Sequence, residues 1–131
     1  MHNSSAIVTP VSSVAVRRDE FELLVDEALA DLPSWVTDAV DNLQVVVEDW
    51  PTPAQDPSGV TLLGLYEGVN LHDRASGYSG FLPDRITLFM GPHLGLRLPP
   101  RRLRAQIRKT VLHEVAHHLG IDDQRLGELG Y

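Results

Sequence analysis

The stretch that decides the fold reads TVLHEVAHHLGIDD and runs from Thr110 to Asp123. Its apolar residues would wrap most of a helix, and Gly120 stands where such a helix would stop. His113 and His117 are four residues apart, so both imidazoles lie on one helix face, roughly 6 Å apart, and can reach the same ion. Zinc accepts neutral imidazole nitrogen at about 2.0 to 2.1 Å. The stretch therefore predicts a buried helix that carries two metal ligands.

Glu114 and Asp123 complete the chemistry of this motif. Glu114 lies about 100° round the helix from His113, so it borders the metal as a general base for a zinc-bound water should. Gly120 lets the chain leave the helix in a left-handed turn, and the segment can then double back until Asp123 reaches the ion. Three protein ligands plus one water form the open arrangement of catalytic zinc. We therefore expect one zinc ion per chain, held by His113, His117 and Asp123.

The spacing of the motif is specific. The pattern His-Glu-x-x-His alone would arise by chance in about one sequence of this length in a hundred, and the added Gly and Asp lower that by roughly two orders of magnitude. Two histidines and a glutamate on a buried helix also need polar partners, which a metal supplies. Asp122 is an alternative to Asp123 as the third ligand, if the turn after Gly120 is built differently.

Outside this helix the sequence predicts an α+β domain. Pro99 and Pro100 suit the first turn of the final helix, which would run to about Leu119. Upstream, helical periodicity, β-branched runs and breaks at Pro or Gly predict two helices and three strands, at 19–32, 34–41, 43–47, 60–66 and 85–90. Asp19 is the expected N-cap of the first helix. The order α, short α, β, β, β, α indicates a small sheet with two main helices.

Length and composition indicate one folded unit. At 131 residues the chain can build a single modest core. Residues 1–16 are rich in Ser and Val and aperiodic, so we expect a flexible N-terminal arm there and a single domain over 17–131. No run of about 18 apolar residues could span a membrane, and no signal peptide is evident. The lack of cysteine excludes disulfides and thiolate ligands and suits a cytoplasmic location.

Charge is distributed unevenly along the chain. The net charge of −7 argues against a general nucleic-acid binder, because neutralising phosphates requires local basicity. Residues 19–56 carry eleven acidic side chains and no Lys or Arg. A basic cluster over 97–109 holds Arg97, Arg101, Arg102, Arg104, Arg108 and Lys109. We interpret this basic cluster as a solvated helix face opposite the acidic N-terminal helix, or as a surface for an anionic partner.

The remaining polar residues are given structural roles. His118 is expected to pack on the side of the helix formed by Ile107 and Val111, and Glu67 and Arg85 are candidates for a structural ion pair. Surface-loop positions are expected for His72, Asp73 and His93, and His72 could reach the mouth of the cleft. Tyr66 and Tyr131 are expected to pack in the core or near the terminus, with stabilisation of an oxyanion as the alternative.

The sequence resembles the minimal zincins, a family of small bacterial zinc metallopeptidases. The resemblance covers about Phe21 to Tyr131 and rests on Phe21–Leu32, Leu63–Gly68, Pro83–Phe89 and Thr110–Asp123. It implies a small mixed sheet of about three to four strands beside a long C-terminal active-site helix. It also implies metal binding by His113, His117 and Asp123, with Glu114 as the base. The edge strand beside the cleft would be 85–90, where a peptide substrate could add as an extended strand.

Three functions follow from these observations. The first is a zinc-dependent peptidase, in which Glu114 activates a zinc-bound water that hydrolyses a peptide bond. The second is a metal-dependent ribonuclease; Glu114 and Asp123 favour the peptidase over it. The third is a metal-stabilised binding module with weak or no catalysis. Only eight residues follow Asp123, and no methionine stands near the motif, so the lower wall of the cleft found in larger zincins is missing.

Overall fold

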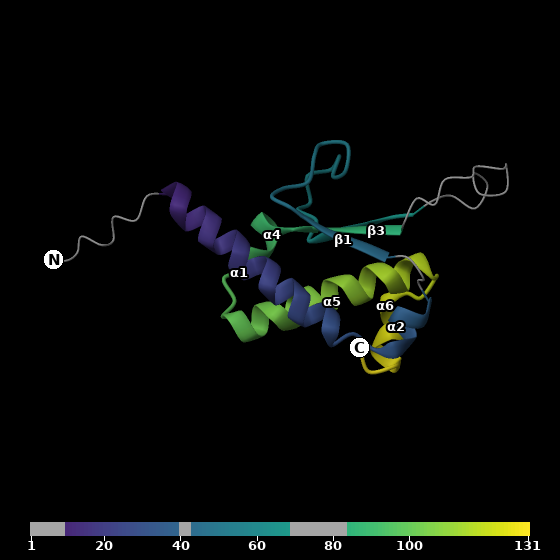
Figure 1. The fold of residues 1–131 in the computed structure, drawn as a ribbon. Coiled ribbons are helices and arrows are strands. Elements are labelled where there is room, and N and C mark those ends of the chain that lie inside the picture. The colour runs from purple at the N-terminus through teal and green to yellow at the C-terminus, as the bar shows by residue number, and fades with distance from the viewer. Residues whose placement is uncertain (1–9, 40–42, 69–83) are drawn as a thin grey trace, which may run out of the picture.

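A computed structural model (Figure 1) describes residues 10–39, 43–68 and 84–131, and describes side chains over 17–38, 43–68 and 84–131. Along the chain its elements are α1 (Pro10–Ala30), α2 (Ser34–Ala39), β1 (Leu43–Glu48), β2 (Gly64–Glu67), β3 (Asp84–Phe89), α4 (Met90–Leu94), α5 (Pro100–His118) and α6 (Asp123–Glu128). This confirms the α+β class, with a small mixed sheet and a long C-terminal helix.

The sheet has three strands in the order β1-β3-β2. β3 pairs in parallel with β1, where Val45 lies opposite Ile86, and antiparallel with β2, where Tyr66 lies opposite Ile86. The expectation that strand 85–90 forms the sheet edge is therefore wrong. Both hydrogen-bonding edges of β3 are occupied, and Ile86, Leu88 and Phe89 are fully buried, as suits a central strand. Within the described part of the chain, β1 and β2 are the edges.

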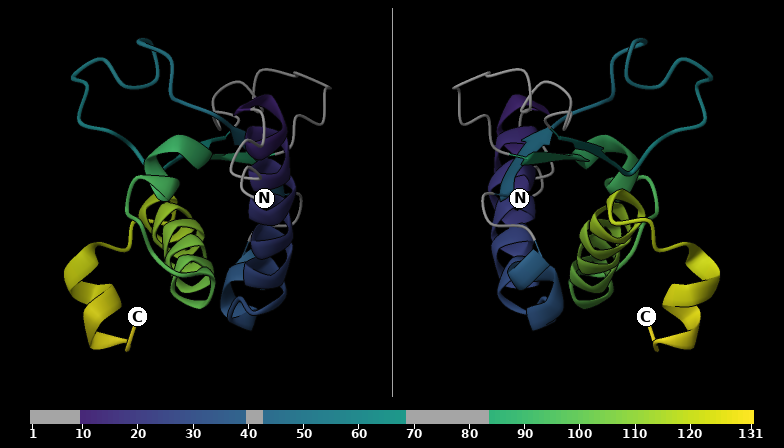
Figure 2. Two further views of the ribbon diagram at one scale, coloured as in Figure 1. Left: turned by 90° about the vertical axis from the view of Figure 1, so that its left-hand side faces the viewer. Right: turned by 90° about the vertical axis from the view of Figure 1, so that its right-hand side faces the viewer.

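α5 packs against the sheet through contacts with β2 and β3, and α1 packs against α5. Figure 2 shows α1 and α5 side by side, with α5 below the strands and α6 on the opposite side of α5 from α1. One core joins these elements, and its buried members include Phe21, Val25, Ala28, Ile86, Leu88, Ile107, Val111, Val115 and Leu126. α5 thus has one long face in the core, which holds the motif segment at its C-terminal end in place.

The helices differ from the sequence expectation at one boundary and by two additional short helices. α1 begins at Pro10 instead of Asp19; a proline in the first turn lacks only an N–H that has no partner there. α4 and α6 were not expected, because each has only five or six residues and lies next to or contains Gly or Pro, which the sequence analysis interpreted as a break. The division into an arm (1–16) and a domain (17–131) stays a prediction, and residues 1–9 lie outside the described residues. Among the described helices none is both long and apolar enough to cross a membrane.

Candidate metal centre

The end of α5 turns the chain back on itself. Gly120 adopts a left-handed conformation, with φ of +84°. Its N–H donates to the carbonyl of His117 at 3.0 Å, and the N–H of Ile121 donates to the carbonyl of Ala116 at 2.8 Å. This pair of bonds is a Schellman motif, which satisfies the last carbonyls of a helix and reverses the chain direction. The reversal brings the start of α6 beside the end of α5.

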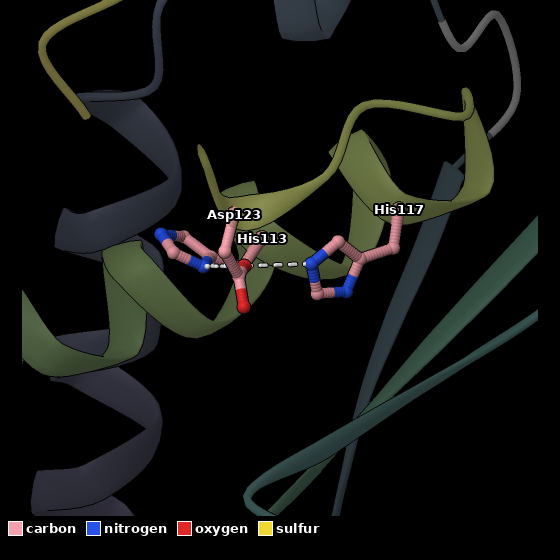
Figure 3. A group of neighbouring side chains, drawn as sticks. All are labelled: His113, His117 and Asp123. Carbon is pink, nitrogen blue, oxygen red and sulfur yellow. Dashed lines mark hydrogen bonds and ion pairs between the residues drawn. The ribbon is translucent and has the colours of Figure 1, made fainter. Parts of the chain in front are cut away.

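The two aspartates that follow the turn have different positions. Asp122 is the N-cap of α6, and its carboxylate accepts a hydrogen bond from the N–H of Arg125 at 2.8 Å. Asp123, the first residue of α6, instead points at the two histidines of α5 (Figure 3). The structure therefore brings Asp123, and not Asp122, to the histidine pair.

His113, His117 and Asp123 converge from two helices. His117 Nε2 lies 2.8 Å and His113 Nδ1 lies 3.2 Å from the same Oδ1 of Asp123. Ligand atoms bound at about 2.0 to 2.1 Å to a tetrahedral zinc are separated by roughly 3.3 Å, so this spacing is close to that of a coordination shell. Two imidazoles and a carboxylate are also a donor set that zinc accepts. These three residues could hold a metal ion.

The ionised carboxylate of Asp123 suits a bound cation. The hydrogen bond from His117, aided by the charges of His117 and His113, lowers the pKa of Asp123, so the carboxylate stays ionised. Asp123 and His117 are exposed, so an ion bound there would be open to solvent. His113 is half-buried, and its Nε2 is buried without a hydrogen-bond partner among the described residues. This nitrogen is not the one that faces Asp123, since that contact is made by Nδ1 of the same ring.

Glu114 connects α5 to the edge strand β2. Its Oε1 accepts a hydrogen bond from the backbone N–H of Tyr66 at 3.1 Å. Burial raises the pKa of Glu114, while the Tyr66 N–H and the two nearby histidines act in the opposite direction. A carboxylate whose pKa is raised by burial is a stronger base when ionised. Glu114 therefore has the surroundings of a general base next to the group that could hold a metal.

Two neighbouring contacts also attach β2 to its surroundings. The ring of His118 stacks on Tyr66 with centroids 4.0 Å apart, so it does not pack on the Ile107 and Val111 side as expected. The expected pair between Arg85 and Glu67 is present at 3.3 Å, but both side chains are more than two-fifths exposed. Such a pair contributes little to stability.

His93 is a correction to the sequence analysis. It was expected in a surface loop, but it lies in α4 and is fully buried. Its Nδ1 bonds to the carbonyl of Phe89 at 2.9 Å, and its Nε2 lies 3.1 Å from the hydroxyl of Thr110. The Gly91-Pro92 pair, interpreted as a break, conceals the helical turn that buries it. His72 and Asp73 lie outside the described residues, and Tyr131 packs on Trp35 as expected.

The chain was compared with known protein families and solved structures. A family model described as zincin-like metallopeptidase matches residues 40–131. A solved structure of a conserved hypothetical protein from Thermus thermophilus is similar, with 28% sequence identity and a TM-score of 0.54. The similarity covers 79% of this chain and 94% of that one. No curated protein matches.

Proposed function

The chain belongs to the zincin-like metallopeptidase family, and from this premise we propose that it hydrolyses peptide bonds in a zinc-dependent reaction. The observation that carries the proposal is the arrangement around the end of α5. Three potential ligands meet at one point, and a half-buried glutamate stands between them and the sheet edge. This combination supplies both the ligands and the base that peptide hydrolysis requires.

His113, His117 and Asp123 would hold the zinc. When bound, zinc supplies Lewis acidity: it polarises a carbonyl and lowers the pKa of water. The Schellman turn fixes Asp123 relative to α5, so the three ligands need little rearrangement. The exposure of His117 and Asp123 leaves room on the solvent side for a substrate.

Glu114 would carry the proton. As water attacks the carbonyl carbon, the carboxylate takes a proton from that water, and it then delivers the proton to the amide nitrogen as the C–N bond breaks. The products are a carboxylic acid and an amine. The hydrogen bond from the Tyr66 N–H holds one oxygen of Glu114 and leaves the other for this transfer.

A peptide substrate would lie along β2, not along 85–90. Leu63 directs its carbonyl to the N–H of Phe89 in β3 at 3.0 Å. Backbone groups alternate along an antiparallel strand, so those of Gly64 point to the other side. That outer side of β2 borders Glu114, which is where an added strand would bring its scissile bond.

The first experiment compares wild type and Glu114→Gln on a mixed peptide library and on single-stranded RNA, with zinc content measured in parallel. We expect wild type to cleave peptides and not RNA. Glu114→Gln should keep its zinc and lose at least about 100-fold in rate, the usual effect of removing a general base. Glu22→Gln, an exposed change on α1, is the matched control and should retain full activity.

Two outcomes would contradict the proposal. Cleavage of RNA alone, dependent on Glu114, would identify a ribonuclease. Zinc retained without peptide cleavage by wild type would identify a metal-stabilised binding module.

A further inference from the structure

The basic cluster divides into two parts in the structure. Arg104 lies 3.8 Å from the carboxylate of Glu27, and Arg108 donates to the carbonyl of Asp31 at 2.9 Å. Glu27 lies in α1 and Asp31 directly follows it. Arg104 and Arg108 therefore lie on a helix face that is opposite the acidic N-terminal helix, as one interpretation of the cluster predicted. The other part has no ion pair or side-chain hydrogen bond within the described ranges and consists of Arg97, Arg101, Arg102 and Lys109.

A groove of about 720 Å³ lies between α1, α4 and the start of α5, and the unpaired Arg97 is part of its lining. Its floor is apolar: Phe21 and Leu103 are buried, and Leu94 and Leu98 are partly buried. Trp50 forms one wall and is 62% exposed, although such a large apolar ring is costly to leave in water. The volume lies within the usual range of ligand-binding pockets.

The wall at Trp50 is built by close packing. A Cβ on Gly91 would lie 2.3 Å from the indole ring, so the ring rests directly on the backbone at the start of α4. The indole is therefore fixed with one face covered, and its exposed part lies beside the groove. A rigid aromatic side chain that is already ordered loses little entropy when a partner covers it.

The charges at the rim of the groove are mainly positive. Arg17 and Arg97 line it, and neither pairs with an acidic side chain among the residues described. Glu20 is the one carboxylate in the lining. The N-terminus of α5 adds its positive dipole end, because Pro99 offers no side-chain cap and the first turn has no acidic residue. The chain as a whole has a net charge of −7, so this rim is a local positive region on an acidic protein. Such a region favours a partner with negative charges.

We propose that this groove docks an acidic segment of a partner protein, which inserts an apolar side chain beside Trp50 and places carboxylates on Arg17 and Arg97. Exposed Trp and unpaired Arg are the residue types that carry most of the binding energy in protein interfaces. Leu103 precedes His113 by ten residues of α5, or roughly 15 Å. The groove is therefore separate from the candidate metal centre, and the inference does not depend on the proposed peptidase activity.

The test selects a random heptapeptide phage library on the full-length, folded chain. The enriched sequences should combine Leu or Phe with flanking Asp or Glu. A synthetic copy should change the fluorescence of Trp50, measured in a Trp35→Phe background, and bind more weakly as salt is raised. Arg17→Glu should weaken binding at least tenfold, and Arg17→Lys should retain most of it. Lys109→Glu, an exposed reversal of charge on α5 outside the groove, should change binding less than twofold.

The proposal is overturned if no acidic sequence is enriched, or if the peptides bind Arg17→Glu and wild type equally. It is also overturned if Arg17→Glu abolishes a concentration-dependent dimer seen by ultracentrifugation, because the occupant would then be a second copy. Binding to phosphatidylglycerol vesicles in place of the peptides would assign the groove to a lipid surface.

Discussion

At the scale of single residues, Asp122 and Asp123 are adjacent in the sequence but have different structural roles. Asp122 binds the backbone of its own helix at Arg125, whereas Asp123 faces His113 and His117. The sequence left both open, because their order does not say which carboxylate the turn directs inward. The histidine pair itself was predictable, since four residues along a helix fix a shared face without any tertiary information.

Among the described residues, His93 is a buried titratable side chain outside the candidate metal centre. Burial lowers the pKa of its imidazole below the ordinary value of 6.5, so the folded state resists protonation. Above pH 6.5 the imidazole is neutral in both states, and folding gains or loses nothing through it. As the pH falls below 6.5, the unfolded chain takes up the proton first, so the free energy of unfolding decreases until the folded pKa is reached.

We therefore expect the free energy of unfolding to fall by up to about 1.4 kcal/mol per pH unit below pH 6.5. Urea unfolding between pH 8 and 5.5 would measure this slope. His93→Gln keeps hydrogen-bonding atoms near Phe89 and Thr110, and it should be less stable at pH 8 but lose most of the slope. A slope unchanged in His93→Gln would assign the titration to another group.

At the scale of elements, the position of each strand in the sheet could not be predicted from the sequence. The sequence predicted a strand at 85–90, but strand order depends on pairings between distant segments. β3 occupies the centre because β1 and β2 both bond to it. The unexpected helices have the same origin: α4 is buried by its packing on α5, and α6 is fixed by the Asp122 cap and by Leu126 in the core. Such contacts leave no local periodicity in a five- or six-residue segment.

Gly64 sets the distance between β2 and α5. A Cβ added there would lie 2.7 Å from Cγ2 of Thr110 and 3.3 Å from the carbonyl of Thr87. Gly64→Ala should therefore move β2 away from α5 and lengthen the bond between Glu114 and the Tyr66 N–H. We expect a loss of about 1 to 3 kcal/mol in stability, the usual cost of overpacking, with a drop in peptidase rate.

Gly127→Ala in α6 is the matched control for that change. Nothing lies within 4 Å of a Cβ at Gly127, so the substitution should be neutral or stabilise by up to about 1 kcal/mol. Thermal unfolding and peptide cleavage of the two variants measure both effects. Equal behaviour of the two alanine variants would mean that β2 does not depend on close packing at Gly64.

At the scale of the whole molecule, α5 serves two separate regions. Its C-terminal half carries His113, Glu114 and His117, and its N-terminal half borders the groove below Trp50. The middle of the helix packs against the sheet and against α1 through core residues. The fold class and the helix α5 could be predicted because the hydrophobic periodicity of the helix extends over many residues. The groove could not be predicted, because it forms where three segments that are far apart in the sequence meet.

The zinc content of the purified chain tests the central claim most directly. We expect about one zinc per chain by mass spectrometry for wild type and for Asp122→Asn, which keeps an N-cap for α6. His117→Ala and Asp123→Ala should retain far less, because each removes one of three protein ligands. A natively folded wild-type protein that binds no zinc, or an Asp123→Ala variant that binds it as tightly as wild type, would contradict the account.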